Sequence, residues 1–366
     1  YQSGNPTVFN TKQVDFDGAD DHLKVINAYG SFTGTWSFWF KRDSATEGFL
    51  VDARGSTQSG TGYVFFSGSN LTVNVQSGTV YVNGVAGSVN MALNEWNHLV
   101  VTGMTLNITE QILIGSRWNN SGYFNGQMSQ VGLWNSTLTA DEVSSLYNHG
   151  LPIDLTTNQA AYESSSNLVG YWRMGSGTLD GFPLIADQTN ATLGSNLVLN
   201  GTFETAYTSA EWLAFSTPTT LERSTNQAYE GSYSLRIAGS DGKGVQASAS
   251  QFTGDYTVGD VVKITAYVYP ITSPNNSIKT GVNSSDRSPF ILFTGLTLNQ
   301  WNKVEYYVTI STASNNYISF LNSGTGEFYL DNVSAEIVGG NPAMMINLGG
   351  GADFSDGIKN GSPYAN

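Results

Sequence analysis

The residues from Tyr123 to Gly150 constrain the fold of this 366-residue chain more than any other stretch. Residues 127–134 alternate with a period of two, which predicts a β-strand. A helix start follows, because Thr139 and Glu142 have the spacing of a capping box. The apolar residues of this short helix fall on one face: Val143, Leu146 and Tyr147. Gly150 is expected to end the helix. One short amphipathic helix after a long run of strands is typical of a β-sandwich that the helix closes.

Short alternating segments separated by turns continue the strand pattern through the first third of the chain. In residues 36–41, Trp39 falls on the face opposite to the other aromatic rings. We favour a second apolar layer or an interface there over a ligand platform. His98 lies in an apolar strand with no second histidine nearby, so we favour a core imidazole over a metal ligand. Further strands are expected about every ten residues: 61–66, 71–75 and 79–82.

Several motifs resemble, in their order, the laminin-G-like domains of the concanavalin-type lectin and glucanase superfamily. They are DFDGADD at 15–21, TWSFWFK at 35–41, YVNG at 81–84, EWNHLVVT at 95–102 and the whole stretch 123–150. The resemblance implies a β-sandwich domain over residues 1–153, with residues 1–13 as an arm. Calcium is common in that family, and the resemblance implies these candidate ligands: Asp17, Asp20, Asp21 and Asp52.

A second group of strands runs from Asn196 to Val338. Its motifs are NLVLNGTFE at 196–204, AYEGSYSLRI at 228–237, VVKITAYVY at 261–269 and FYLDNVSAEIV at 328–338. Their order resembles the galactose-binding-like jelly roll of carbohydrate-binding modules in families four, nine and twenty-two. The sequence therefore predicts an all-β protein: two antiparallel β-sandwich (jelly-roll) domains in tandem, with one short helix closing the first.

Two segments fall outside these domains. Residues 154–195 are predicted to be a partly ordered connection, which Tyr171 and Trp172 hold against one domain. Residues 339–366 lack periodicity and are rich in glycine, so they are predicted to be an extended C-terminal tail. Its apolar residues, Met344 and Met345 among them, need a surface to pack against in this chain or in a neighbouring subunit.

The resemblance to carbohydrate-binding jelly rolls implies a structural Ca²⁺ between the first and last strands of the second domain. The matching positions are Glu204 in NGTFE and Asp331 in YLDNV, and Glu230 is a candidate third ligand. Calcium takes roughly six to eight oxygen ligands, usually including a carboxylate. The alternative, that Glu204 and Asp331 form only local hydrogen bonds at strand ends, is equally open.

Sugar binding needs exposed rings with polar neighbours. Tyr267, Tyr269 and Tyr307 lie on the strand faces opposite to Ala266, Val268 and Val308, and Trp212 lies in the first loop. These four aromatic residues are the candidate glycan-binding set. The favoured alternative is that they belong to the core, because both faces of some sandwich strands are covered.

The composition excludes several classes of function. The net charge of −14 disfavours nucleic-acid binding, and no apolar stretch is long enough to insert into a membrane. With no cysteine, the chain has no disulfide or thiolate metal site. Charged residues make up only 12% of the chain, as in extracellular and virion β-proteins. The E-x-D-x-E patterns of the superfamily's glycosidases and the G-x-S-x-G elbow are absent, so the chain is expected not to be an enzyme.

Two further resemblances suggest a setting. NLVGYWRMG at 167–175 and NPAMM at 341–345 resemble segments of bacteriophage structural proteins. We therefore expect a non-enzymatic virion protein on the particle surface, as a capsid decoration, head fibre or tail-fibre component. Its expected partners are further copies of itself, plausibly in a trimer, other virion proteins and a host-surface glycan. The alternative is a secreted bacterial glycan-binding adhesin, or the accessory carbohydrate-binding modules of a larger enzyme.

Overall fold

The structure of the protein, a computed structural model, consists of two compact units. The described residues are 11–27, 29–58, 60–69, 71–87, 90–248, 256–272, 277–282, 291–312, 316–346 and 358–360. Unit 1 comprises Tyr1–Thr192 and Gly339–Asn366, and unit 2 comprises Leu193–Val338. Unit 2 is therefore inserted into the sequence of unit 1. Each unit is built from two antiparallel sheets, which confirms the predicted all-β class.

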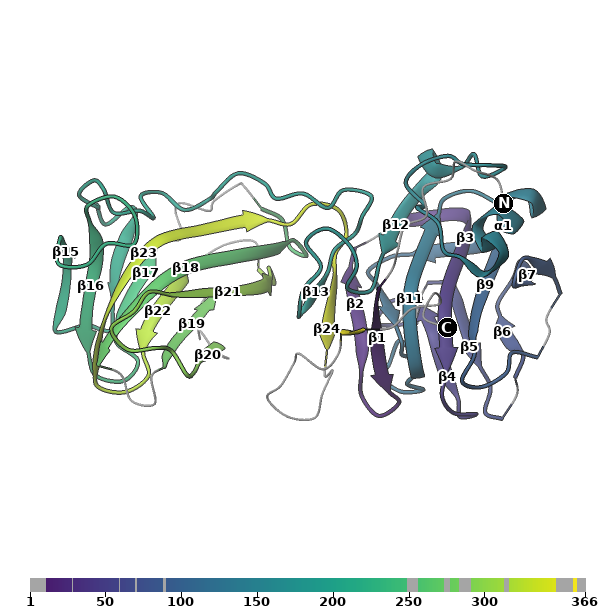
Figure 1. Ribbon diagram of the computed structural model, residues 1–366, viewed down its shortest axis with the longest axis horizontal. Coiled ribbons are helices and arrows are strands. Elements are labelled where there is room, and N and C mark those ends of the chain that lie inside the picture. The colour runs from purple at the N-terminus through teal and green to yellow at the C-terminus, as the bar shows by residue number, and fades with distance from the viewer. Residues whose placement is uncertain are drawn as a thin grey trace. The chain divides into compact units, whose positions relative to one another are not determined.

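Unit 1 is a sandwich of an eight-stranded and a seven-stranded sheet (Figure 1). The first sheet has the order β25-β1-β11-β3-β9-β7-β8, with β12 also paired to β11. Its strands are β1 (Lys12–Asp17), β3 (Gly30–Arg42), β7 (Thr79–Val82), β8 (Val85–Ala86), β9 (Trp96–Ile108), β11 (Asn125–Trp134), β12 (Leu168–Trp172) and β25 (Ile358–Asn360). The second sheet has the order β13-β24-β2-β10-β4-β5-β6. Its strands are β2 (His22–Ile26), β4 (Gly48–Asp52), β5 (Tyr63–Phe66), β6 (Val73–Val75), β10 (Gln111–Ile114), β13 (Leu184–Ile185) and β24 (Ala343–Ile346).

Alternation along β3 fills the core of unit 1 on one side and builds an apolar layer on the other. The inward rings are fully buried: Trp36, Phe38 and Phe40. On the opposite face Trp39 stacks on His98, with ring centroids 4.8 Å apart, and on Tyr147 at 6.0 Å. The His98 Nε2 lies 2.8 Å from Ser37 Oγ, and burial lowers the pKa of His98 to about 3. The second apolar layer at Trp39 and the core imidazole at His98 are both confirmed.

Helix α1 (Ala140–Tyr147) packs on the outer face of the eight-stranded sheet through Val143 and Leu146. The predicted capping box is confirmed: Thr139 Oγ1 accepts from the Glu142 N–H at 3.3 Å, and Glu142 Oε2 accepts from the Thr139 N–H at 2.9 Å. The helix ends earlier than predicted, because Asn148 takes the left-handed conformation at its C-terminus. Two 3₁₀ turns follow, Asn148–Gly150 and Ser165–Asn167. Among the described residues, no helix has the length and apolar character needed to cross a membrane.

The predicted connection 154–195 belongs almost entirely to unit 1, because it contributes strands and core rings. β1 pairs with the first part of β11, and β12 pairs with the second part. Tyr171 and Trp172 of β12 are fully buried in the unit. β13 then pairs with β24 of the other sheet. The boundary between the two units falls after Thr192.

The predicted tail also differs from the expectation, because part of it lies inside a sheet. β24 pairs with β2 on one side and with β13 on the other (Figure 1). Met345 is 6% exposed and lies in the core of unit 1, so the surface that the tail needs is in its own chain. β25 pairs with β1, which begins at Lys12 inside the predicted arm 1–13. Residues 1–10, 347–357 and 361–366 lie outside the described residues.

Unit 2 is a sandwich of two five-stranded sheets. One has the order β14-β17-β22-β19-β20. Its strands are β14 (Trp212–Phe215), β17 (Gly244–Ala247), β19 (Ile278–Val282), β20 (Ile291–Phe293) and β22 (Ile318–Asn322). The other has the order β15-β16-β23-β18-β21. Its strands are β15 (Thr220–Ser224), β16 (Ser234–Gly239), β18 (Val261–Thr272), β21 (Asn302–Thr309) and β23 (Gly326–Ile337).

β18 shows how the sequence directs side chains in unit 2. Ile264, Ala266 and Val268 are fully buried in the core between the two sheets. The residues between them are partly exposed on the other side of the sheet, as the alternation along a strand requires. We call this side, directed away from the core, the outer face of the β18 sheet.

Candidate functional site

Five aromatic rings gather on the outer face of the β18 sheet. This aromatic cluster consists of Tyr229, Tyr267, Tyr269, Trp301 and Tyr329. β18 supplies two of the rings, and Tyr329 of β23 lies in register with Tyr269. The loops before β16 and β21 supply the other two. The sheet therefore positions the base of the cluster, and the loops add to it.

The rings are in direct contact. Tyr229 stacks on Tyr267 with centroids 3.6 Å apart and an angle of 15° between the ring planes. Trp301 meets Tyr229 at 5.8 Å and 70°, and Tyr269 at 5.4 Å and 64°. Tyr269 and Tyr329 are 6.2 Å apart at 84°. The three edge-to-face pairs have a geometry that aromatic rings favour, whereas Tyr229 and Tyr267 lie almost directly over each other, closer than offset-stacked rings. These contacts join the five rings into one group.

This ring surface is open to solvent. Tyr229 is 41% exposed, whereas Tyr329 at the base is 4% exposed. Tyr267, Tyr269 and Trp301 are half-buried and do not belong to the core of unit 2. Large rings that remain exposed in a group are unusual on a monomer surface and mark a place for a ligand or partner.

Charged side chains flank the cluster in compensated pairs. Arg236 donates from Nε to Glu327 at 2.9 Å and from Nη1 to Glu222 at 2.9 Å. Lys263 and Lys303 share Glu305, with N···O distances of 3.2 and 2.7 Å. The surface around the rings is therefore polar and rich in hydrogen-bonding groups, while its charges are balanced locally.

The structure separates the four predicted platform residues. Tyr267 and Tyr269 lie in the aromatic cluster. Tyr307 lies on the same face beside Lys263, whose Nζ is 5.9 Å from the ring centroid. Lys303 of β21 is the cross-strand partner of Tyr267, and Tyr307 is four residues further along the same strand. Tyr307 is therefore about 13 Å along the strand from the position of Tyr267.

Trp212 as a platform residue is wrong, and the alternative of a core residue holds. Its side chain is 1% exposed and packs against Phe203 at 5.1 Å. Its Nε1 donates to the carbonyls of Leu199 and Asn200 at 3.2 and 3.3 Å. The residue begins β14 instead of lying in a loop, and an indole held in this way cannot offer a face to a ligand.

Sequence reasoning missed three members of the cluster. Tyr329 alternates with the core residues Phe328 and Leu330, so the period of two on β23 identifies its face. Trp301 directly precedes β21, which is a weaker signal. Tyr229 carries no signal of its own, because a loop that is fixed only by tertiary contacts brings it to the sheet.

Two carboxylates hold that loop. Asp331 Oδ2 accepts from the N–H groups of Tyr229 at 2.8 Å and Glu230 at 3.3 Å. Glu204 Oε1 accepts from the N–H groups of Ser232 and Tyr233, both at 2.9 Å. The local hydrogen bonds that were the alternative to calcium are therefore present at Glu204 and Asp331.

The donor set also has the chemistry of a cation site. Asp331 is fully buried, and burial raises the pKa of its carboxyl to about 6, with a further contribution from the negative charge of Glu204. A cation held between the two carboxylates would offset that repulsion. One carboxylate oxygen of Glu230 is already engaged, because its Oε2 accepts from the side chain of Asn332 at 3.2 Å. Glu204 and Asp331 thus fit a calcium ion in chemistry, and Glu230 is the weakest of the three candidates.

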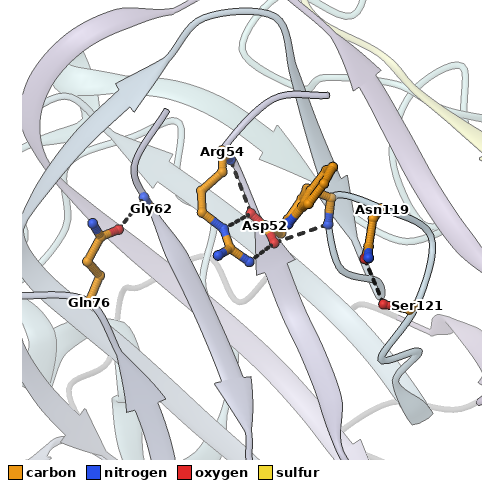
Figure 2. A network of polar contacts seen from close by, with 7 residues as sticks. Asp52, Arg54, Gly62, Gln76, Asn119 and Ser121 are labelled. Atoms are coloured by element: carbon orange, nitrogen blue, oxygen red, sulfur yellow. Dashed lines mark hydrogen bonds and ion pairs between the residues drawn. The ribbon is translucent and has the colours of Figure 1, made fainter. Parts of the chain in front are cut away.

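Asp52, a calcium candidate of unit 1, is neutralised by an arginine. Arg54 donates to its two carboxylate oxygens from Nε at 2.9 Å and from Nη2 at 2.5 Å, as Figure 2 shows. The N–H of Trp118 donates to Asp52 Oδ2 at 3.1 Å. A buried bidentate pair of this kind satisfies the carboxylate, so the expectation of a free calcium ligand is wrong at Asp52.

Asp17, Asp20 and Asp21 do come together, with one oxygen of each within 4.8 Å of the others. Their turn is closed by its own hydrogen bonds: Asp17 Oδ1 accepts from the Ala19 N–H at 2.7 Å, and Asp21 Oδ2 accepts from the Asp17 N–H at 3.0 Å. Calcium at this turn stays a prediction.

No protein-family model and no curated protein matches the chain. Among solved structures, the family 22 xylan-binding domain CBM22-1 of Xyn10C from Paenibacillus barcinonensis is 21% identical and covers 40% of this chain and 97% of its own, with a TM-score of 0.33. The tandem CBM22-1-CBM22-2 of that protein is 12% identical and covers 84% of this chain and 78% of its own, at 0.32. A pentraxin from Limulus polyphemus is 15% identical and covers 38% and 82%, at 0.29. At these TM-scores the likenesses carry no argument about function, which has to come from the geometry of the aromatic cluster.

Proposed function

We propose that the protein is a non-enzymatic glycan-binding protein and that the aromatic cluster of unit 2 is its binding surface. The observation that carries the proposal is the position of the rings, which face solvent on a sheet instead of filling the core. The apolar C–H face of a pyranose packs on such rings, while its hydroxyl groups need polar partners nearby. Arg236, Glu327 and Lys303 around the rings can supply those partners.

The environment of Glu327 and Asp331, the two carboxylates of β23 beside the aromatic cluster, supports a non-enzymatic role. Glycosidases need two carboxyl groups that reach the substrate from both sides of the scissile bond. Glu327 is engaged by Arg236 at 2.9 Å. Asp331 is fully buried, and its two oxygens accept three backbone N–H groups, from Tyr229, Glu230 and Asn332.

Titration calorimetry with a panel of neutral hexasaccharides tests the binding surface. The panel contains β-1,4-linked glucose, xylose and mannose and α-1,4-linked glucose. Trp301→Ala should weaken binding by about tenfold, because it removes a stacking ring. Tyr307→Ala is the matched control, an aromatic residue of the same face beside Lys263, and should bind like the wild type. If the wild-type protein binds no sugar of the panel, the proposal falls. An equal loss in Tyr307→Ala would place the site elsewhere on the face.

The setting is part of the proposal. A bacteriophage virion surface is our first choice, with the protein as a homo-oligomer that contacts other virion proteins and attaches to host glycans. A secreted adhesin, or accessory modules of a larger enzyme, is the second. The sequence resemblances at 167–175 and 341–345 support the first setting. Antibody labelling of purified particles distinguishes the two, and light scattering of the purified protein determines the oligomeric state.

We also propose that Glu204 and Asp331 hold a structural Ca²⁺. Chelator should then lower the melting temperature of unit 2, and added Ca²⁺ should restore it. In Glu204→Ala the response to chelator should disappear, whereas Glu305→Ala, on the outer face beside Lys263 and Lys303, should keep it. A melting temperature that chelator leaves unchanged would mean that backbone hydrogen bonds alone satisfy the two carboxylates.

A further inference from the structure

The loop of residues 229–233 decides which ring of the aromatic cluster meets the ligand. We infer that Tyr229, and not Tyr267, is the ring on which the sugar stacks, and that Glu204 and Asp331 are positioning residues that hold Tyr229 over the sheet. The inference rests on the proposed function.

The stacking geometry leaves one ring face for the ligand. Tyr229 and Tyr267 are nearly parallel, with ring centroids 3.6 Å apart, so each ring covers one face of the other. The side chain of Tyr229 is 41% exposed, and that of Tyr267 is half-buried. A planar ring has two faces, and one face of Tyr229 already rests on Tyr267. The sugar is therefore received by the other face of Tyr229, with Tyr267 as its support.

One cross-strand pair holds both the ring and the backbone of Tyr229. Asp331 on β23 lies in register with Tyr267 on β18, on the same face of the sheet. The side chains of such pairs are neighbours, with Cβ atoms about 5 Å apart. Tyr267 supports the ring from below, while Asp331 Oδ2 accepts the Tyr229 N–H at 2.8 Å. Backbone and side chain of Tyr229 are thus fixed from one place on the sheet.

Glu204 fixes the far end of the same loop. Its Oε1 accepts the N–H groups of Ser232 and Tyr233, and the chain bends around it at Gly231. Gly231 has φ +73°, and a Cβ there would lie 2.4 Å from Glu204 Oε1. An alanine there would displace the Glu204 carboxylate and would also hold an unfavourable positive φ. The two carboxylates together form a clip on the loop, and we call Glu204 and Asp331 the carboxylate clip.

The clip gives Tyr229 its orientation before any ligand arrives. A loop that is already ordered loses less conformational entropy on binding than a free one, so preorganisation adds to affinity. Damage to the clip should therefore weaken glycan binding although neither carboxylate contacts the sugar. It should also change the stacking of Tyr229 on Tyr267 in the absence of any glycan.

A pair of glycine variants in the full-length protein tests the clip without altering its carboxylates. Gly231→Ala pushes against Glu204, whereas Gly242→Ala introduces a side chain at a nearly equal φ of +71° with no atom within 4 Å. The first readout is the ring protons of Tyr229 and Tyr267 in protein with ¹³C-labelled tyrosine, assigned with Tyr229→Phe. The second is calorimetry with the neutral hexasaccharide panel described above. Both are repeated with chelator present.

Gly231→Ala should abolish the upfield ring shifts that stacking produces and weaken binding of the hexasaccharide by roughly two- to tenfold, while Gly242→Ala should change neither. Stacked rings in Gly231→Ala, or equal effects of both variants, would overturn the inference. Because the proposed Ca²⁺ binds the same two carboxylates, chelation should weaken the stacking in the wild type and should change nothing further in Gly231→Ala. If Gly231→Ala does not fold, Glu204→Gln takes its place, with Glu110→Gln as control, because Glu110 is an exposed glutamate of unit 1 that accepts the Ser56 N–H at 2.9 Å. If the wild type binds no sugar, the proposed function fails, whereas the ring shifts still decide whether the clip positions Tyr229.

Discussion

Asn341 joins the C-terminal segment to three other parts of unit 1. Its N–H donates to Asp187 Oδ2 at 3.1 Å, and its carbonyl accepts from Trp172 Nε1 at 3.0 Å. Its side-chain oxygen accepts from the side chain of Asn27. The segments 167–175 and 341–345, which contain Trp172 and Asn341, looked like separate features in the sequence. In the structure they belong to one hydrogen-bonded assembly.

Asp187 is the residue on which this assembly depends most. It is fully buried and accepts from the backbone N–H groups of Tyr171, Thr189 and Asn341. Asp187→Ala leaves these donors unpaired and should destabilise unit 1 by about 3 kcal/mol. Denaturant unfolding measures the change. A loss below about 1 kcal/mol would show that water replaces the carboxylate.

The same residue predicts a dependence on pH. Burial raises the pKa of Asp187 above its ordinary value, although its hydrogen bonds act in the other direction. Because the folded pKa exceeds the unfolded one, this group adds most stability below the unfolded pKa of about 3.9, and the contribution falls as the pH rises through the folded pKa. The unfolding free energy of the wild type minus that of Asp187→Asn should therefore become more positive as the pH is lowered from 7 to 4. A difference that shrinks over this range would contradict the assignment.

The sequence predicted which side chains point into the core only in strands where apolar and polar residues alternate. On β18 the period of two correctly put Tyr267 and Tyr269 opposite Ala266 and Val268. It gave no information about Trp212, because burial of that ring depends on Phe203 and on the carbonyl groups that accept from its Nε1. Contacts between residues distant in sequence decide which polar or aromatic groups become a site.

At the scale of elements, α1 is the part that local sequence determines most completely. Thr139→Ala removes the side-chain acceptor of the capping box and should lower the stability of unit 1 by about 1 kcal/mol. Thr137→Ala, two residues earlier and exposed, is the control and should be close to neutral. Chemical denaturation of both variants provides the comparison. Equal effects would mean that packing of Val143 and Leu146, not the cap, holds the helix.

The opposite case is β24, whose strand character depends on its neighbours. Its segment lacks periodicity, and β2 and β13 provide the hydrogen-bonding partners. Met345 points into the core of unit 1, and Met344 is partly exposed. Met345→Ala should destabilise unit 1 by about 2–3 kcal/mol, and Met344→Ala by less than about 1 kcal/mol. If the two substitutions lower the unfolding free energy of unit 1 equally, β24 does not occupy the described register.

At the scale of the whole molecule, the insertion of unit 2 into unit 1 is the main organising feature. The two ends of unit 2 are neighbours, because Leu193 forms a bridge with Val338. On the unit 1 side the Gly339 N–H donates to the Thr192 carbonyl at 2.8 Å. The sequence predicted two domains in tandem. In the structure the chain leaves unit 1 after Thr192 and returns to unit 1 at Gly339.

This arrangement predicts that the two units can be separated. Replacing 193–338 by an Asn-Gly turn between Thr192 and Gly339 should leave unit 1 folded, since a two-residue turn joins paired strands without strain. Residues 193–338 alone should fold as well. Each product should unfold in a single cooperative transition in calorimetry. A version of unit 1 without the insertion that fails to fold would show that unit 2 contributes to its stability.

The sequence by itself determined the all-β class, the faces of the long strands and the cap of helix α1. These features depend on side-chain alternation and on hydrogen bonds within a few residues. The tertiary structure decided the division of the chain, the place of β24 and the assembly of the aromatic cluster. Tyr229 reaches the sheet through Asp331, which is 102 positions away in the chain. Pairings over such separations depend on the folded arrangement of whole strands, and no local pattern encodes them.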